Sequence, residues 1–118
     1  MEDLARRGES LAAEYLAGKG FQILSRNHRI GHGEIDIIAL DGEYTVFVEV
    51  KTRLSAQYGP PEYSMTRKKQ NQLMRLALGY FHQQGISECP CRFDFVAVEF
   101  ERGTPVIRHI ANAFTSMP

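Results

Sequence analysis

Residues 33–53, GEIDIIALDGEYTVFVEVKTR, constrain the fold more than any other part of this sequence. Two apolar runs, 34–40 and 44–52, are rich in Ile and Val, and Asp41-Gly42 separates them. β-branched residues favour strands, and Asp-Gly between two such runs is a strong hairpin signal. The stretch therefore predicts two strands joined by a tight turn.

Three charged residues interrupt these apolar runs: Asp36 in IDIIAL, and Glu49 and Lys51 in VFVEVK. Side chains alternate between the two faces of a strand, so Glu49 and Lys51 point to the same side. The turn decides where Asp36 lies. A two-residue turn at Asp41-Gly42 sets Asp36 opposite Phe47, and a four-residue loop sets it opposite Glu49. Both of these loop lengths place Asp36, Glu49 and Lys51 on one face, and only an odd-length loop would separate them.

Charged side chains in apolar strands are costly, because neighbouring carboxylates repel and burial penalises their charge. A hard divalent cation, Mg²⁺ or Mn²⁺, removes both problems, since it takes carboxylate oxygens and keeps waters in its shell. The backbone carbonyl of Val50 is a natural further ligand. Lys51 is then placed to orient a water or to offset the charge of a phosphate. The spacing alone is equally consistent with an ion pair between Lys51 and either acid.

The rest of the chain adds two helices and three strands. Asp3 is a plausible N-cap of the first helix, and Gly85 ends the second. Several strands are apolar on both faces, which suits a sheet covered on both sides. We predict one α/β domain over residues 1–118, with a mixed sheet of about five strands flanked by helices. The expected helices are 3–19 and 66–84, and the expected strands are 21–29, 34–40, 44–52, 92–99 and 106–111, in the order α-β-β-β-α-β-β.

The composition, with 43% hydrophobic and 24% charged residues, is ordinary for a soluble globular protein. No apolar run approaches the roughly 20 residues that span a bilayer, and the N-terminus has no signal-peptide core. We therefore expect a cytoplasmic protein with no membrane partner.

The formal net charge is zero, so no overall field attracts nucleic acid. Basic residues nevertheless gather locally, and such patches can bind phosphate. Arg26 and Arg53 are plausible phosphate contacts, and Arg53 lies one strand period beyond Lys51. In contrast, Arg92 and Asp94 are interpreted as a structural pair. Between 51 and 75, a single acid, Glu62, accompanies Lys51, Arg53, Arg67, Lys68, Lys69 and Arg75.

The motif GEIDIIALD followed by VFVEVKTR resembles the signature of the YraN-like family of small, uncharacterised bacterial proteins. The likeness covers nearly the whole chain, including residues 8–29, the loop GPPEYSMTRKKQNQL, and the ending RFDFVAVE with IRHIANAF. That family resembles the Holliday-junction-resolvase and restriction-endonuclease-like nucleases, the PD-(D/E)XK superfamily. Ile35 replaces the proline of that name, a common departure in the superfamily.

The resemblance assigns roles to particular residues. It implies that Asp36, Glu49 and Lys51 form the D…ExK set, and that Glu9 on the first helix joins the metal site. Lys69 is the best match for a phosphate contact on the second helix, and Gln70 and Gln72 are further candidates. Resolvase-like nucleases often act as dimers, so the resemblance leaves a homodimer open, although the sequence shows no interface pattern.

These observations together predict a metal-dependent endonuclease that hydrolyses phosphodiester bonds in DNA, with branched or damaged DNA as candidate substrates. Two alternatives remain at this point. One is a nucleic-acid-binding module that keeps the fold without cutting. The other is a protein-interaction factor with no nucleic-acid role, which leaves the costly acid and lysine placements without a use.

Overall fold

The computed structural model describes residues 3–54, 60, 64–87 and 89–114. Its helices and strands follow one another in the order predicted from the sequence. They are α1 (Leu4–Gly18), β1 (Gln22–Ile30), β2 (Gly33–Asp41), β3 (Tyr44–Arg53), α2 (Arg67–Gln84), β4 (Cys91–Glu101) and β5 (Thr104–Phe114). Most of the loop predicted at 54–64 lies outside the described residues.

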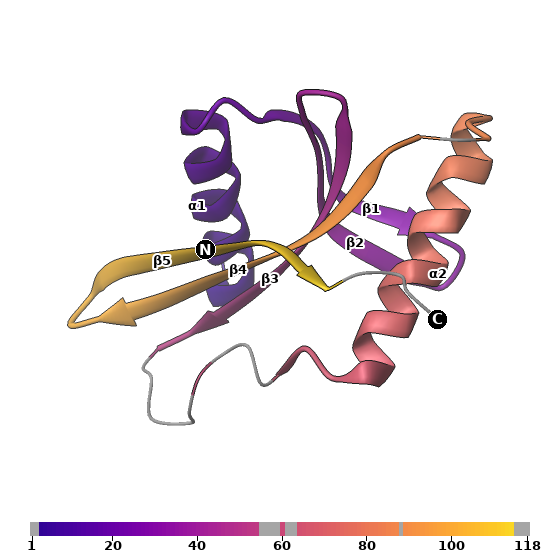
Figure 1. Ribbon diagram of the computed structural model, residues 1–118. Coiled ribbons are helices and arrows are strands. Elements are labelled where there is room, and N and C mark those ends of the chain that lie inside the picture. Colours follow the sequence, from indigo (N-terminus) through magenta and orange to yellow (C-terminus); the bar gives the residue numbers. More distant parts are fainter. Residues whose placement is uncertain (1–2, 55–59, 61–63, 88, 115–118) are drawn as a thin grey trace.

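The strands form one mixed sheet in the order β1-β2-β3-β4-β5. Neighbouring strands are antiparallel except β3 and β4, which are parallel. A parallel pair needs a crossover connection, and α2 provides it. Figure 1 shows α1 and α2 on opposite sides of the strands. The predicted α/β fold with helices on both faces of a mixed sheet is therefore confirmed.

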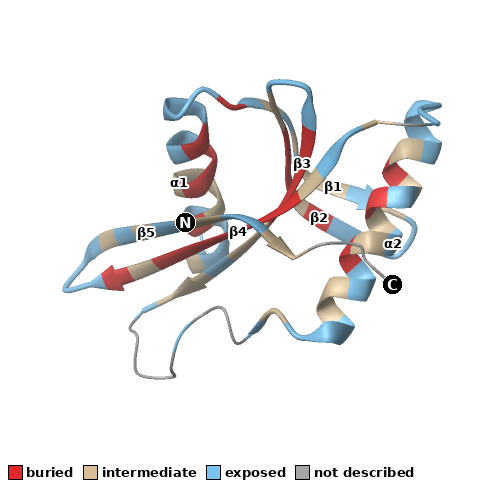
Figure 2. Ribbon diagram, in the orientation of Figure 1, coloured by how far each residue is buried: buried red, intermediate tan, exposed pale blue. Residues whose placement is uncertain are grey.

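Two hydrophobic clusters hold the layers together, one on each face of the sheet. Val46 and Val48 pack towards α1 with Leu16, whereas Phe47 packs towards α2 with Leu73. The alternation along β3 is what strand geometry requires of a segment covered on both sides. Figure 2 shows buried residues along the middle of the strands and on the helix faces that meet them.

Both helices begin at the caps that their sequences provide. The Asp3 side chain accepts a hydrogen bond from the Arg6 amide at 2.8 Å, and the Thr66 hydroxyl accepts one from the Lys69 amide at 3.2 Å. Gly85 ends α2 with a left-handed backbone, φ 69°. Neither helix carries an acid in its first turn.

The β2–β3 turn settles the register that the sequence left open. Leu40 pairs with Thr45, as the longer predicted loop requires, so the alternative that pairs Leu40 with Glu43 is wrong. Asp41 and Tyr44 also pair, which leaves Gly42 and Glu43 as the turn residues. The turn is displaced by one residue because Gly42, with φ 60°, takes the first central position, where a tight hairpin needs a positive φ.

Strand β5 is longer than the predicted segment 106–111, since it runs from Thr104 to Phe114. The strand passes Asn112 despite a left-handed backbone there, φ 53°, and the register with β4 shifts between Phe93 and Phe95. This irregularity hides the alternation at the end of the strand. Within the described residues, neither helix is long and apolar enough to cross a membrane.

Candidate metal and phosphate site

The predicted acids meet where β2 and β3 lie side by side. The pair Ile37–Val48 ends the regular ladder, and the next step of the same register sets Asp36 opposite Glu49. Oδ2 of Asp36 accepts a hydrogen bond from the Val50 amide at 2.8 Å. This bond fixes the Asp36 carboxyl against β3. The two acids thus lie on one face of the sheet, as an even-length turn predicted.

The electrostatics of the pair are unusual. Burial, repulsion by the Glu49 carboxylate and a hydrogen bond with it raise the pKa of Asp36 to about 8, although the Val50 amide opposes the shift. The Glu9 carboxylate raises it further. At neutral pH, Asp36 therefore keeps a proton that faces Glu49, because two adjacent buried carboxylates cannot both hold their charge.

Glu9 reaches this site from α1, and its helix lies unusually close to β3. Gly8 is buried, and a Cβ at Gly8 would overlap the Thr52 side chain. A glycine is therefore required for this approach of α1 to the strand. Glu9 is partly buried, whereas Glu14, five residues further along α1, is exposed.

Asn27 on β1 is a site residue that sequence reasoning missed. Its Nδ2 atom donates to Glu9 Oε1 at 2.8 Å and to Glu34 Oε1 at 3.4 Å. Its Oδ1 atom accepts from Arg6 at 3.3 Å. An amide is suited to this position because it offers both a donor and an acceptor. Asn27 has a φ of 49°, a left-handed conformation that asparagine tolerates better than most residues but that no strand pattern predicts.

Lys69 lies on the other side of the acids, in the first turn of α2. Its Nζ atom is 2.9 Å from Oε2 of Glu49. Arg67 and Lys68 precede it and are exposed, and α1 likewise begins with the exposed Arg6 and Arg7. Cations are unfavourable at helix N-termini, where the backbone already carries positive potential. Anions are favoured at such ends.

The remaining predicted residues divide into accessible and engaged side chains. Lys51 is exposed, two residues beyond Glu49 on the same strand, and Gln72 is exposed on α2. Arg53 pairs with Glu99 at 3.1 Å, and its side chain is only 12% exposed. Arg26 donates to Ser10 at 2.9 Å. Of these, Lys51 is the cation best placed to meet a phosphate beside the acids.

The donor set is suited to a hard divalent cation, since oxygen ligands are what Mg²⁺ and Mn²⁺ prefer. Asp36 and Glu49 supply two carboxyls, and Glu9 lies near enough to raise the pKa of Asp36. Among the described residues, no group of three or more acid, histidine or cysteine side chains converges tightly enough to enclose an ion. Asn27 holds Glu9, and Lys69 holds Glu49. The side chain of Glu9 must therefore rotate for its carboxylate to join those of Asp36 and Glu49 around one ion.

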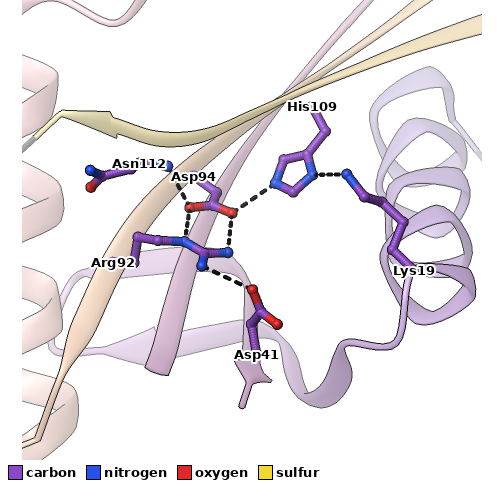
Figure 3. A network of polar contacts seen from close by, with 6 residues as sticks. All are labelled: Lys19, Asp41, Arg92, Asp94, His109 and Asn112. Carbon is purple, nitrogen blue, oxygen red and sulfur yellow. Dashed lines mark hydrogen bonds and ion pairs between the residues drawn. The ribbon is translucent and has the colours of Figure 1, made fainter. Parts of the chain in front are cut away.

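A second polar network lies on the α1 face of the sheet, where Arg92 and Asp94 of β4 pair with Val46 and Val48 of β3 (Figure 3). Asp94 is 1% exposed and accepts two bonds from Arg92, one from His109 Nε2 at 2.7 Å and one from the Asn112 amide at 3.0 Å. Burial works to raise the pKa of Asp94, but these donors outweigh it and the pKa is lowered. The predicted Arg92–Asp94 pair is confirmed.

The same network ties distant parts of the chain together. Arg92 also bonds Asp41 at 2.9 Å, and Lys19 Nζ lies 2.9 Å from His109 Nδ1. Lysine ammonium can only donate, so Nδ1 accepts and Nε2 carries the proton given to Asp94. The network thus links the end of α1, the β2–β3 turn and the β4–β5 hairpin. Its hydrogen bonds hold these segments together and so stabilise the fold.

The fold and the site define a small α/β protein with a carboxylate pair, a third acid and two lysines gathered on the strands and helices around β3. The family model of the uncharacterised protein family UPF0102 matches residues 8–98. A UPF0102 protein of Geobacter metallireducens is 46% identical over 113 residues, covering 96% of this chain and 93% of the relative. One from Chlorobium chlorochromatii is 47% identical over 118 residues, covering 95% and 91%. The chain belongs to the UPF0102 family, the YraN-like family that its motifs resemble.

Proposed function

We propose that this protein is a metal-dependent endonuclease that hydrolyses phosphodiester bonds in DNA. The observation that carries the proposal is the Asp36–Glu49 pair, in which burial and repulsion force one acid to retain a proton near neutral pH. A divalent cation would replace that proton and relieve the repulsion. An acid pair kept at this cost is typical of a functional site.

Asp36, Glu49 and the backbone carbonyl of Val50 would hold Mg²⁺ or Mn²⁺, with Glu9 as a third carboxylate. The ion would supply Lewis-acid stabilisation of phosphate charge and activation of water. The Val50 amide keeps Asp36 in place at 2.8 Å, and the ammonium of the exposed Lys51 offsets charge that develops on the phosphate. This is the division of roles that the resemblance to the PD-(D/E)XK nucleases implies.

The charges around the acids support a nucleic-acid substrate. The first turns of α1 and α2 carry basic residues and no acids, and both turns lie next to the site through Glu9 and Lys69. A phosphate backbone that crosses from one helix to the other would meet favourable potential at both ends. Because the formal net charge is zero, binding would depend on this local potential and not on an overall field.

A cleavage assay tests the proposal. End-labelled single-stranded, duplex and four-way-junction DNA would be incubated with the protein in Mg²⁺, Mn²⁺ or EDTA. We expect divalent-dependent cleavage that falls about 100-fold or more in Lys51→Met, because the transition state loses a positioned cation. Arg102→Met is the matched control and should keep its activity, since Arg102 is exposed in the turn between β4 and β5, outside this surface.

Absence of cleavage of all three substrates by the unaltered protein, in either metal, would contradict the proposal. Binding of DNA that persists in that case, and that survives Asp36→Ala, would favour a module that binds without cutting. Loss of that binding as the salt concentration rises would show that phosphate contacts carry it.

A further inference from the structure

One row of residues crosses all five strands at the level of the acids. The flanking pairs of β1 and β2 set Asn27 opposite Asp36, and continuing the β2–β3 register by one step beyond its last pair sets Asp36 opposite Glu49. Glu49 pairs with Phe95, and Phe95 pairs with Ile110. Adjacent strands are about 4.8 Å apart, so the polar half of the row passes directly into an apolar half.

A cavity of about 160 Å³ lies at the apolar end of this row. Its lining comes from β4 and β5 on one side and from the start of α2 on the other. Gln70 is the residue after Lys69, which pairs with Glu49, so the cavity adjoins the acids through the helix as well as the sheet. The lining residues are Met65, Gln70, Phe95, Ile110 and Ala113.

The size and lining of the cavity limit what it can hold. An engineered apolar cavity of about 150 Å³ takes one benzene ring, whereas sites for larger ligands begin near 300 Å³. The cavity therefore has room for one six-membered ring and not for a base pair. Gln70 is its polar lining residue. Nε2 of Gln70 donates to the Met65 carbonyl at 3.0 Å, and Oε1 has no hydrogen-bond partner in the described part of the chain.

We infer that this cavity receives one unpaired pyrimidine base from a nucleic-acid strand whose phosphate lies at the Asp36–Glu49 site. The inference rests on the proposed function and narrows its substrate. The cavity is one to two strand spacings from Glu49, roughly 5–10 Å, which a single nucleotide spans. A pyrimidine ring offers apolar faces that Met65 and Ile110 can cover. It also offers an N–H or amino group that can donate a hydrogen bond to the Gln70 oxygen. A base within a duplex must first unpair and unstack to enter, which costs a few kcal/mol.

Binding of two strands that differ only in their bases tests the inference without any variant. Fluorescence anisotropy in EDTA would compare a short oligothymidylate with an abasic strand of the same length, so that the phosphate charge is matched. We expect the oligothymidylate to bind about 5-fold to 100-fold more tightly, the range for one buried or stacked base.

A cavity-filling variant locates the effect. Ala113→Leu fills the cavity, and Ala111→Leu makes the same change at an exposed position two residues away on β5. We expect Ala113→Leu to bind both strands with the affinity that the unaltered protein shows for the abasic strand. Ala111→Leu should keep the preference for bases. Thermal unfolding shows whether each variant is folded. If Ala113→Leu does not fold, the comparison of the oligothymidylate with the abasic strand, made with the unaltered protein, tests the inference.

The outcomes separate this inference from the proposed function. Equal binding of oligothymidylate and abasic strands, by a protein that still cleaves DNA in Mg²⁺, would overturn the inference alone. Failure to bind either strand, together with failure to cleave, would overturn both. A base preference that Ala113→Leu retains while folded would place the base elsewhere and would also overturn it.

Discussion

The Nζ atom of Lys69 lies 2.9 Å from Oε2 of Glu49, so a lysine of α2 neutralises one acid of the site while a proton neutralises the other. Without a metal, the pair is thus balanced by two single positive charges. A divalent cation carries the same charge in one particle. Lys69 and a bound cation should therefore compete for Glu49.

Lys69→Met should bind Mn²⁺ about tenfold more tightly than the unaltered protein when no DNA is present. The substitution frees an oxygen of Glu49 and removes a positive charge that repels the ion at short range. Titration calorimetry with Mn²⁺ measures the change, and Lys68→Met, which alters an exposed neighbouring lysine, is the control. Weaker Mn²⁺ binding in Lys69→Met would show that the lysine supports the site instead of competing for it.

Asp36→Asn should stabilise the metal-free protein. Below pH 3.8 the aspartate is protonated in both the folded and the unfolded chain, and from there up to about pH 8 only the folded chain holds that proton. Stability is therefore lost as the pH rises through this window. Asparagine carries no charge to lose and still accepts from the Val50 amide.

We expect the gain in unfolding free energy to grow from near zero at pH 4 to about 1–3 kcal/mol at pH 8. Urea unfolding in EDTA across this range measures it. Glu43→Gln, at an exposed acid in the β2–β3 turn, should show no such trend. A loss of stability in Asp36→Asn at pH 8 would mean that the acid pair does not strain the fold.

Asn27→Gly should weaken Mn²⁺ binding about 10-fold to 100-fold, the usual effect of removing a group that orients a metal ligand. Glycine keeps the left-handed backbone but deletes the amide that holds Glu9 at 2.8 Å. Asn112→Gly is a close control, because Asn112 has a similar φ of 53° and gives only its backbone amide to Asp94. Equal Mn²⁺ affinities in the two variants would show that the Asn27 amide does not orient Glu9 for metal binding.

Asp94→Asn should destabilise the fold by about 2–4 kcal/mol, since the partly buried Arg92 and His109 lose the carboxylate charge of Asp94 that both contact. The lowered pKa of Asp94 adds a pH dependence to the unaltered protein. Its stabilising effect is present above pH 3.8 and is lost as the pH falls through the folded-state pKa. Urea unfolding should show this acid loss in the unaltered protein and not in Asp94→Asn.

Local patterns predicted the elements and the shared face of the acids, because alternation and helical spacing depend only on neighbours in sequence. Asp36 and Glu49 met as expected, since either even-length turn gives the same face. The exact turn could not be predicted, because Gly42 can serve at either central position. Contacts between segments that are far apart in the sequence could not be predicted either. Lys19 meets His109 across 90 positions, and the role of Asn27 depends on how closely α1 approaches β3.

The most direct test of the proposed metal site is the number of protons released when Mn²⁺ binds. Calorimetry at pH 7, in buffers that differ in ionisation enthalpy, measures both the affinity and the proton count. The account predicts one Mn²⁺ per chain with release of about one proton, because the ion replaces the proton on Asp36. Asp36→Asn should lose both the binding and the release. No heat of Mn²⁺ binding, or unchanged binding in Asp36→Asn, would contradict the account.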